Sequence, residues 1–304
     1  MSDDLSDGGE ALLLAEEQVR FFRTFGFVVL RQHFTEVEMS TIDAELAGAV
    51  ERTFADRPFD ERTSSSESLQ QVSLTRAITP FICALPEGPQ FYGIARQLYG
   101  ADAIGHESSA VLYVGDTRWH ADRSGTDIQV SDFGCKFCIY PKPLGADTGA
   151  LSVMPGSFST SYYDALRNLP GIADDTRIGD FPGFVCHTEP GDVVLFNLNC
   201  WHASQGGRPG RILIDVVYYN YPKTPQHLAE TRFTYARQRQ MAIENALSRD
   251  VEPPTPTVDE YLARADSPLM KTWLVDRPLE FGFFDFDREA YIEECLAPTR
   301  DSAR

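Results

Sequence analysis

The chain lacks any apolar run long enough to cross a membrane, and its acidic N-terminus carries no basic segment. A membrane-spanning helix needs about 20 consecutive apolar residues. A secretory signal begins with a basic region before its apolar stretch. We therefore expect a cytoplasmic protein that has no membrane partner.

Cationic residues are also in the minority. Lys and Arg together number 27 against 45 Asp and Glu, which leaves a formal net charge of -18. A chain of this charge is poorly suited to bind nucleic acid or an anionic lipid surface, although acidity also serves plain solubility. We expect a small-molecule substrate and no nucleic-acid partner, in a monomer or a homodimer.

Cysteine is scarce, with six residues scattered over 304 positions. That pattern is typical of reduced thiols and not of a disulfide framework. Cys135 and Cys138 form a C-x-x-C, which raises the possibility of a zinc or redox site. The motif falls on a predicted strand, however, where residues three apart point to opposite faces. We expect two separate buried thiols.

What the chain does contain is enough apolar material for a folded core, with 42% hydrophobic and 12% aromatic residues. No repeat is apparent, and we predict a single domain over residues 1–304. Residues 11–106 are predicted to be an N-terminal decoration of helices and a strand, and residues 221–304 a helical extension. The expected helices lie near 12–25, 35–50, 90–99, 162–169 and 226–246, the strand at 27–34, and a polar surface loop at 56–75.

Residues 107–220 have a different texture, with short β-branched and aromatic runs separated by turn residues. This pattern predicts a mainly β fold with flanking helices, as an antiparallel barrel or a double-sheet jelly roll. The expected strands are 108–114, 117–121, 134–140, 150–154, 183–189, 192–197, 200–205 and 211–219.

Two places in this region carry residues that suit a metal. His202 lies on the run that enters the turn before Arg211, and His120 and Asp122 form an H-x-D pair upstream. Two imidazoles and one carboxylate with open coordination positions form the arrangement used by non-haem Fe(II) oxygenases. We therefore predict His120, Asp122 and His202 as metal ligands.

Each of these residues also has an ordinary structural interpretation. A histidine taken alone is more often structural than a ligand, but His120 and His202 each follow a tryptophan. On a strand this order places the indole on one face and the imidazole on the other. Asp122 has the alternative of capping the turn that follows it.

A guanidinium beside the predicted centre suits the recognition of a carboxylate. Arg211 opens an apolar run, so its side chain can enter the barrel, whereas Arg208 lies in a Gly- and Pro-rich turn. A planar guanidinium binds a carboxylate through two parallel hydrogen bonds. Ser204 shares a strand face with His202 and is a second candidate donor for the same carboxylate.

These motifs resemble the phytanoyl-CoA dioxygenase-like (PhyH) family of Fe(II)/2-oxoglutarate-dependent oxygenases. The resemblance covers roughly residues 12–220. It rests on WHAD at 119–122, DTGALSVMPGSF at 147–158, EPGDVVLFNLNCWHAS at 189–204 and GRPGRILIDVVYY at 207–219.

The resemblance implies a double-stranded β-helix of the cupin-like jelly-roll type, with iron held by His120, Asp122 and His202. It implies Fe(II), 2-oxoglutarate and O2 as cofactors, Arg211 as the clamp on the distal carboxylate, and release of succinate and CO2. The expected reaction is hydroxylation or another oxidation of a small-molecule metabolite or natural-product intermediate. Halogenating relatives replace the carboxylate ligand with a small residue, so Asp122 argues against that outcome.

One departure from the family concerns the strand before H-x-D, where some relatives carry a lysine or an aromatic group that helps to hold the keto acid. Here only Tyr113 is available, and Lys136 on the next strand is a candidate substitute. Two other functions remain open at this point. They are a non-catalytic cupin-like protein that binds a metal or ligand, and a metal-dependent hydrolase that uses the same triad.

Overall fold

The computed structural model describes residues 13–56, 58–59, 69–122, 131–169, 172, 181–248 and 257–284. The chain divides into two compact units. The first comprises the described residues up to Asp122 together with Ser131–Asn220, and the second the described residues from Tyr221 onward. That the whole chain forms one domain stays a prediction.

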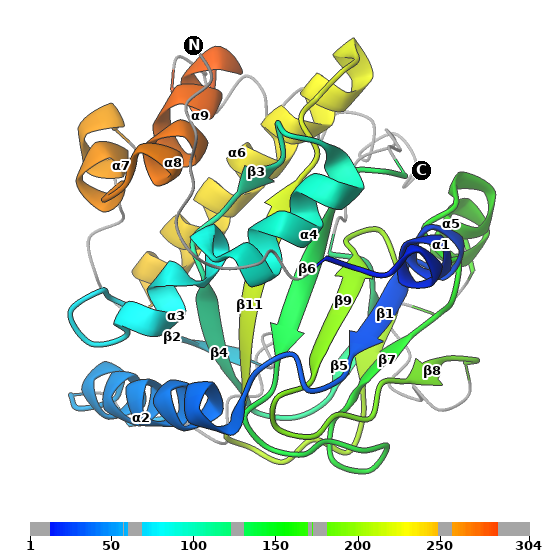
Figure 1. Ribbon diagram of the computed structural model, residues 1–304, viewed down its shortest axis with the longest axis horizontal. Helices are drawn as coiled ribbons and strands as arrows, with labels where there is room; N and C mark the ends of the chain where they lie inside the picture. Colours follow the sequence, from blue (N-terminus) through cyan, green and yellow to red (C-terminus); the bar gives the residue numbers. More distant parts are fainter. Residues whose placement is uncertain are drawn as a thin grey trace. The chain divides into compact units, whose positions relative to one another are not determined.

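The first unit contains two antiparallel sheets (Figure 1). The larger is seven-stranded, with the order β1-β9-β6-β11-β4-β2 and with β3 paired to β11; the smaller is four-stranded, with the order β5-β10-β7-β8. The strands of the larger sheet are β1 (Phe27–Leu30), β2 (Leu69–Val72), β3 (Ile104–Gly105), β4 (Ser109–Tyr113), β6 (Gly134–Ile139), β9 (Val193–Asn197) and β11 (Arg211–Tyr219). Those of the smaller sheet are β5 (Thr117–His120), β7 (Leu151–Val153), β8 (Phe184–Val185) and β10 (His202–Ser204).

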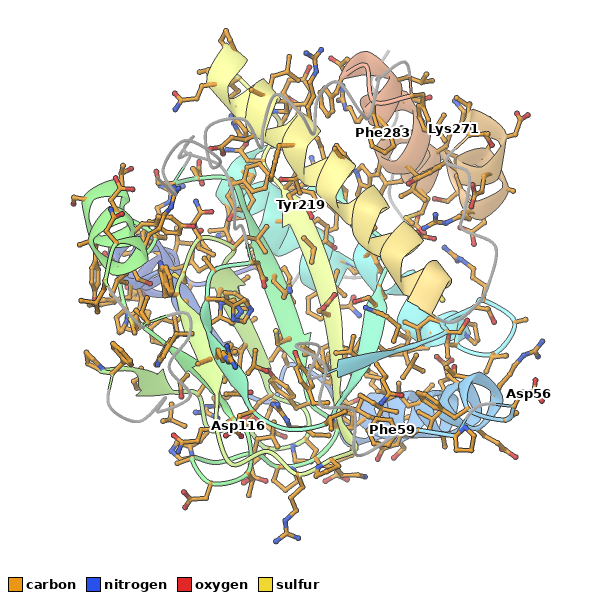
Figure 2. All side chains as sticks on the ribbon, turned by 180° about the vertical axis from the view of Figure 1, so that it is seen from behind. Asp56, Phe59, Asp116, Tyr219, Lys271 and Phe283 are labelled. Atoms are coloured by element: carbon orange, nitrogen blue, oxygen red, sulfur yellow. The ribbon has the colours of Figure 1, made fainter. Side chains whose placement is uncertain are left out.

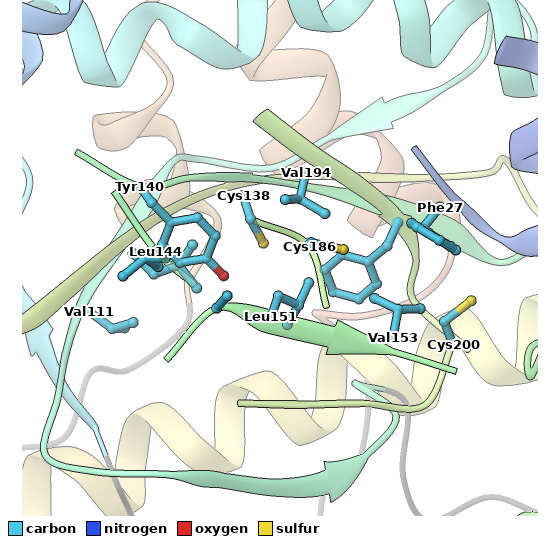
Figure 3. Packing of buried hydrophobic residues seen from close by; sticks show 13 residues of the cluster. Phe27, Val111, Cys138, Tyr140, Leu144, Leu151, Val153, Cys186, Val194 and Cys200 are labelled. Atoms are coloured by element: carbon cyan, nitrogen blue, oxygen red, sulfur yellow. The ribbon is translucent and has the colours of Figure 1, made fainter. Parts of the chain in front are cut away.

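The space between the two sheets is filled mainly by apolar side chains (Figure 3). Alternate residues of each strand point inward, so the larger sheet contributes Val111, Cys138 and Val194. Leu151 and Val153 face them from β7 in the smaller sheet. The two sheets therefore pack face to face as a double-stranded β-helix, which confirms the predicted jelly roll.

Helices cover the outer face of the larger sheet. Helix α4 (Pro89–Tyr99) follows α3 (Pro80–Ala84) and a short 3-10 turn (Leu85–Glu87), and it lies across β6 and β11 in Figure 1. The Phe91 ring packs 4.7 Å from the Phe137 ring, and Phe137 in turn packs against Tyr218. Aromatic residues on the outward face of β6 and β11 thus hold the helix against the sheet.

The outer face of the smaller sheet packs beneath α5 (Thr160–Arg167). Trp119 and Trp201 lie in one buried cluster with Tyr163 and Leu166 of that helix. Trp119 is only 1% exposed. The predicted alternation, with indole rings outside and imidazoles inside, is confirmed on both strands.

The N-terminal elements are α1 (Glu16–Phe25), β1 and α2 (Glu36–Thr53). The predicted capping box of α2 is present: the Thr35 hydroxyl accepts from the Glu38 amide at 3.3 Å, and the Thr35 amide donates to the Glu38 carboxylate at 2.8 Å. The strand predicted at 27–34 ends earlier, at Leu30. Gln32 has a φ of +49°, and its amide donates to Asp192, so the chain turns there.

The polar segment 56–75 was predicted to be a surface loop throughout, and this prediction was wrong for its last part. Leu69–Val72 form β2, which pairs with β4 at the edge of the larger sheet. Residues 57 and 60–68 lie outside the described part of the chain. The two glutamines within β2 concealed the strand, because they weaken the apolar alternation that identifies one.

The cysteine prediction is confirmed for the described residues. Cys135 and Cys138 are both buried, and only Cys138 belongs to the cluster between the sheets. Burial raises the pKa of each thiol well above its usual value. Neither is therefore a reactive thiolate.

The second unit is helical in its described residues. It contains α6 (Pro225–Ser248), α7 (Val258–Arg264), α8 (Pro268–Lys271), a π-helical turn (Thr272–Asp276) and α9 (Arg277–Glu280). Phe283, labelled in Figure 2, packs 5.3 Å from Tyr235 of α6. No helix among the described residues of either unit is both long and apolar enough to cross a membrane.

We expect Thr35→Ala to lower the free energy of unfolding by about 1 kcal/mol, because the amide of Glu38 loses its capping acceptor. Chemical denaturation measures the effect. Thr41→Ala is the matched control, since Thr41 lies within α2 and its hydroxyl donates to the carbonyl of Val37. Equal losses in the two variants would contradict a capping role.

Candidate metal centre

Three side chains predicted as metal ligands come together at one end of the smaller sheet. His120 is the last residue of β5, His202 is the first residue of β10, and the two are directly paired in the antiparallel register. Asp122 lies two residues beyond the end of β5. Residues more than 80 positions apart in the sequence therefore meet because β5 and β10 are neighbours.

The three groups are close enough to share one ion. One ligand atom from each of His120, Asp122 and His202 lies within 4.8 Å of the others. The Asp122 Oδ1 atom is 3.4 Å from His202 Nε2 and 3.7 Å from His120 Nε2. The two imidazole rings have centroids 4.2 Å apart.

Backbone hydrogen bonds orient both imidazoles. The Nδ1 atom of His120 lies 2.8 Å from the carbonyl of Arg118, and that of His202 lies 2.9 Å from the carbonyl of Cys200. Because a carbonyl oxygen only accepts hydrogen bonds, Nδ1 carries the proton in each ring, and Nε2 keeps its lone pair. The two Nε2 atoms face Asp122, so the tautomers and the directions both suit metal ligation.

Charged groups from the larger sheet surround the carboxylate. Lys136 of β6 places its Nζ 2.7 Å from Asp122 Oδ2 and 3.8 Å from Asp215 Oδ2. Asp215 of β11 accepts a 2.7 Å hydrogen bond from the Ser109 hydroxyl of β4. The interior of the barrel is therefore polar near the triad, next to the apolar cluster between the sheets.

The protonation states follow from these contacts. Burial, together with the neighbouring His202 ring, lowers the pKa of His120 to about 4. Burial favours the neutral form of Asp122, but Lys136 and His202 outweigh it and hold that pKa well below its usual range. A neutral imidazole and an ionised carboxylate are the forms that bind a metal, so this part of the site is ready at neutral pH.

Arg211 and Ser204, the two residues predicted to bind the carboxylate, lie next to each other. The Arg211 Nη2 donates to the Ser204 hydroxyl at 2.9 Å, and Nη1 donates to the carbonyl of Gly149. The Arg211 guanidinium lies 4.3 Å from the centre of the Tyr113 ring. Its Nε is buried and has no hydrogen-bond partner among the residues that the structure describes.

Arg208 is exposed, whereas Arg211 is half-buried. The turn that carries Arg208 is hydrogen-bonded to the turn between β4 and β5, where the Gly207 amide donates to the Asp116 carboxylate at 3.3 Å. Asp116 is labelled in Figure 2. Of the two arginines, only Arg211 enters the barrel.

Gly149 was missed as a site residue by sequence reasoning. Its φ is +89°, and a Cβ at this position would lie 2.7 Å from Arg211 Nε. Only glycine therefore allows the guanidinium to lie against this backbone. The sequence DTGAL contains a glycine where a strand begins, but nothing local identifies its neighbour.

The sequence profile of the phytanoyl-CoA dioxygenase (PhyH) family matches residues 22–210, which is more than half of the chain. The chain belongs to this family. It is accordingly an oxidoreductase of the Fe(II)/2-oxoglutarate-dependent dioxygenase class, which uses Fe(II) as its metal and 2-oxoglutarate and O2 as co-substrates.

Individual relatives agree with this assignment. Ectoine dioxygenase of Bordetella parapertussis is 26% identical over 228 residues, covering 65% of this chain and 72% of that protein. Among solved structures, the carbocyclase SnoK from nogalamycin biosynthesis has a TM-score of 0.52 at 20% identity, covering 68% of this chain and 84% of its own. HygX from Streptomyces hygroscopicus, with nickel and 2-oxoglutarate bound, has a TM-score of 0.53 at 16% identity, covering 68% and 87%. The two structures establish the likeness of fold.

The lowered pKa of His120 predicts a pH dependence of stability in the metal-free protein. The unfolded chain protonates this residue near pH 6.5, but the folded chain does so only near 4. Folding therefore excludes a proton, and stability falls as the pH drops from 6.5 toward 4. Asp122 shifts in the same sense, but at pH values below its usual 3.8.

Urea denaturation at pH 7 and pH 5 measures this effect. From pH 7 to pH 5 the wild type should lose more stability than His120→Gln, because Gln cannot titrate. The lowered pKa of His33 affects both proteins equally. We expect a difference of roughly 1 kcal/mol, after allowance for the 40% exposure of the His120 side chain. Identical losses would show that His120 titrates normally.

Proposed function

We propose that His120, Asp122 and His202 bind Fe(II) and that Arg211, with Ser204, binds the distal carboxylate of 2-oxoglutarate. The observation that carries this proposal is the convergence of both Nε2 lone pairs on Asp122 Oδ1. Two neutral imidazoles and one carboxylate leave the bound ion a net positive charge and open positions, which suits an anionic chelating co-substrate.

The spacing along β10 supports the placement of the keto acid. His202 and Ser204 share a face two residues apart, which corresponds to about 7 Å along a strand. A five-carbon diacid spans about 5 Å between its end carbons, and a metal–oxygen bond adds about 2 Å. The two ends of the co-substrate thus match the metal centre and the guanidinium.

The protein's own groups set the binding mode. Arg211 has five N–H donors, of which two serve Ser204 and Gly149. Its other N–H donors would serve a carboxylate, because the buried Nε lies against the Gly149 backbone. Stacking on Tyr113 restricts the guanidinium, and burial raises the pKa of that phenol to about 12, so the neighbour stays uncharged. A clamp fixed before binding loses little conformational entropy on binding.

When bound, Fe(II) with 2-oxoglutarate and O2 would supply the oxidising power, with succinate and CO2 as co-products. The chain's own role is to position the reactants. On one side of the centre, the His202 ring packs against Phe196, which belongs to the apolar cluster between the two sheets.

We infer that the substrate is a small-molecule metabolite or natural-product intermediate, and that hydroxylation is the default outcome. The names of the relatives refer to ectoine and to the biosynthesis of nogalamycin, and both compounds are small molecules. The complete set of metal donors and the Arg211 clamp favour this enzyme over a non-catalytic binding barrel or a hydrolase, neither of which needs a keto-acid clamp.

Anaerobic addition of Fe(II) and 2-oxoglutarate should produce a visible charge-transfer band, because the keto acid chelates the metal. His120→Ala should abolish the band, and Arg211→Ala should weaken 2-oxoglutarate binding about tenfold or more while the metal stays bound. His187→Ala, an exposed histidine outside the centre, is the matched control. An unchanged spectrum in His120→Ala would count heavily against the proposed ligand set.

A second test separates the effect of displacing Arg211 from the effect of straining a left-handed backbone. Gly149→Ala should displace Arg211 and lower the 2-oxoglutarate affinity about tenfold or more, since a hydrogen bond to a charged group contributes about 1.5–3 kcal/mol. Gly156→Ala is the control: its φ is +74°, but the nearest atom to a new Cβ is the Thr24 carbonyl at 3.8 Å. Both variants should lose about 1–2 kcal/mol of stability from the left-handed backbone. Equal 2-oxoglutarate affinities in the two would remove Gly149 from the clamp.

A further inference from the structure

The two oxygens of Asp122 face different groups. Oδ1 faces the Nε2 atoms of His202 and His120, at 3.4 Å and 3.7 Å. Oδ2 instead lies 2.7 Å from the ammonium of Lys136. The carboxylate is thus divided between the metal centre and a cation.

Strand geometry places Lys136 where it is. Lys136 lies on the central strand β6, opposite Val217 of β11 on one side and Phe196 of β9 on the other. Asp215 is two residues before Val217 on β11, so its side chain points to the same inner face. Lys136 therefore reaches across the barrel interior from the larger sheet to a residue that follows a strand of the smaller one.

The Lys136 ammonium also contacts a second carboxylate, that of Asp215. Asp215 Oδ2 is 3.8 Å from Lys136 Nζ, and Asp215 Oδ1 accepts from Ser109, its direct partner on β4. The Lys136 side chain is 18% exposed and that of Asp215 14%. A cation so placed remains charged only when it is paired, and these two carboxylates pair it.

Asp122 depends on such a contact more than the two histidines do. Both imidazoles belong to paired strands and bond to backbone carbonyls through Nδ1. Asp122 lies beyond the end of β5. Among the described residues, its shortest charged contact is the one to Lys136.

We propose that Lys136 is a positioning residue for the metal-ligand carboxylate, and that Asp215 and Ser109 hold Lys136 in place. By binding Oδ2, Lys136 directs one oxygen of Asp122 to the metal and keeps the other from it. A single carboxylate oxygen leaves three coordination positions open, which a chelating keto acid and O2 require. This inference rests on the proposed role of Asp122 as a ligand.

Two other roles would be compatible with a lysine in this position. Lys136 could contact 2-oxoglutarate directly, as a substitute for the group that some relatives carry on the preceding strand. Alternatively it could only neutralise Asp215. The three roles predict different behaviour for metal affinity and 2-oxoglutarate affinity, so the two quantities are measured separately.

The experiment compares Lys136→Met, Asp215→Asn and the double variant Lys136→Met/Asp215→Asn. Metal affinity is measured anaerobically with Fe(II) alone, and 2-oxoglutarate affinity is measured afterwards at saturating Fe(II). The double variant removes one positive and one negative charge, so its site has the same formal charge as the wild type. It therefore isolates the loss of the Asp122 contact from the change in charge.

We expect Lys136→Met to lower Fe(II) affinity about tenfold, the lower end of the range for loss of a group that supports a metal ligand. The double variant should lose a similar factor, because Asp122 Oδ2 has no partner in either protein. Lys136→Arg, which keeps a cationic donor, should recover most of the affinity. The 2-oxoglutarate affinity of Fe(II)-saturated Lys136→Met should stay within about threefold of the wild type.

Three results would overturn the proposal. Removal of a cation near the ion strengthens metal binding by charge alone, so unchanged or tighter Fe(II) binding in Lys136→Met would exclude a positioning role. Recovery of Fe(II) affinity in the double variant would show that Lys136 only neutralises Asp215. Normal Fe(II) affinity with weakened 2-oxoglutarate binding would make Lys136 a contact of the keto acid.

Lys142→Met is the matched control, because Lys142 is an exposed lysine paired with Asp43 at 3.2 Å. Thermal unfolding of the metal-free variants shows whether each is folded. If Lys136→Met does not fold, Lys136→Gln replaces it in both arms of the test. Failure of the proposed function is recognised separately, since the wild type would then show no charge-transfer band even if it binds Fe(II).

Discussion

The pairing of β5 with β10 is the interaction on which the rest of the centre depends. It places His202 directly opposite His120, and the alternation of side chains turns both imidazoles into the barrel. A shift by one residue would reverse the two faces. Trp119 and Trp201 oppose such a shift, because their indoles would leave the apolar cluster under α5 for the polar interior. Packing on the outer face thus determines chemistry on the inner face.

The two sheets contribute different parts of the site. The smaller sheet supplies the nitrogen donors, and Asp122 follows one of its strands. The larger sheet supplies charge: Lys136 and Asp215 next to the triad, and Arg211 farther along the barrel. Buried charges are costly unless they are paired. Polar side chains therefore occur in the barrel interior where they bind one another or a ligand, and the remaining interior is apolar.

Membership in the family and the similarity of fold explain the general chemistry, while the chain's own contacts explain how it is carried out. The metal centre lies at the start of β10, and the guanidinium bonds to Ser204 at the end of that strand. Gly149 and Tyr113 restrict Arg211, and Lys136 restricts Asp122. Such restriction before ligands arrive is how a binding site holds its geometry at low entropic cost.

Sequence alone determined the features that depend on residues close together in the chain, such as the alternation of side chains along a strand. The eight runs predicted between residues 107 and 220 all appear as strands, and the opposite faces of Cys135 and Cys138 followed from the two-residue repeat. The cap at Thr35 was equally readable, because its partner is three residues away. Donor chemistry and the family motifs were enough to nominate the triad.

The tertiary structure decided what depends on partners distant in the chain. The short strand β2 exists because β4 offers it an edge, although its own pattern is weak. The sequence makes Lys136 a candidate contact of the keto acid, and only the fold brings its ammonium to Asp122 and Asp215. Gly149 matters only because Arg211 lies against it. A local pattern specifies which face a side chain takes, but the neighbour that it meets there is set by how strands far apart in sequence come to lie side by side.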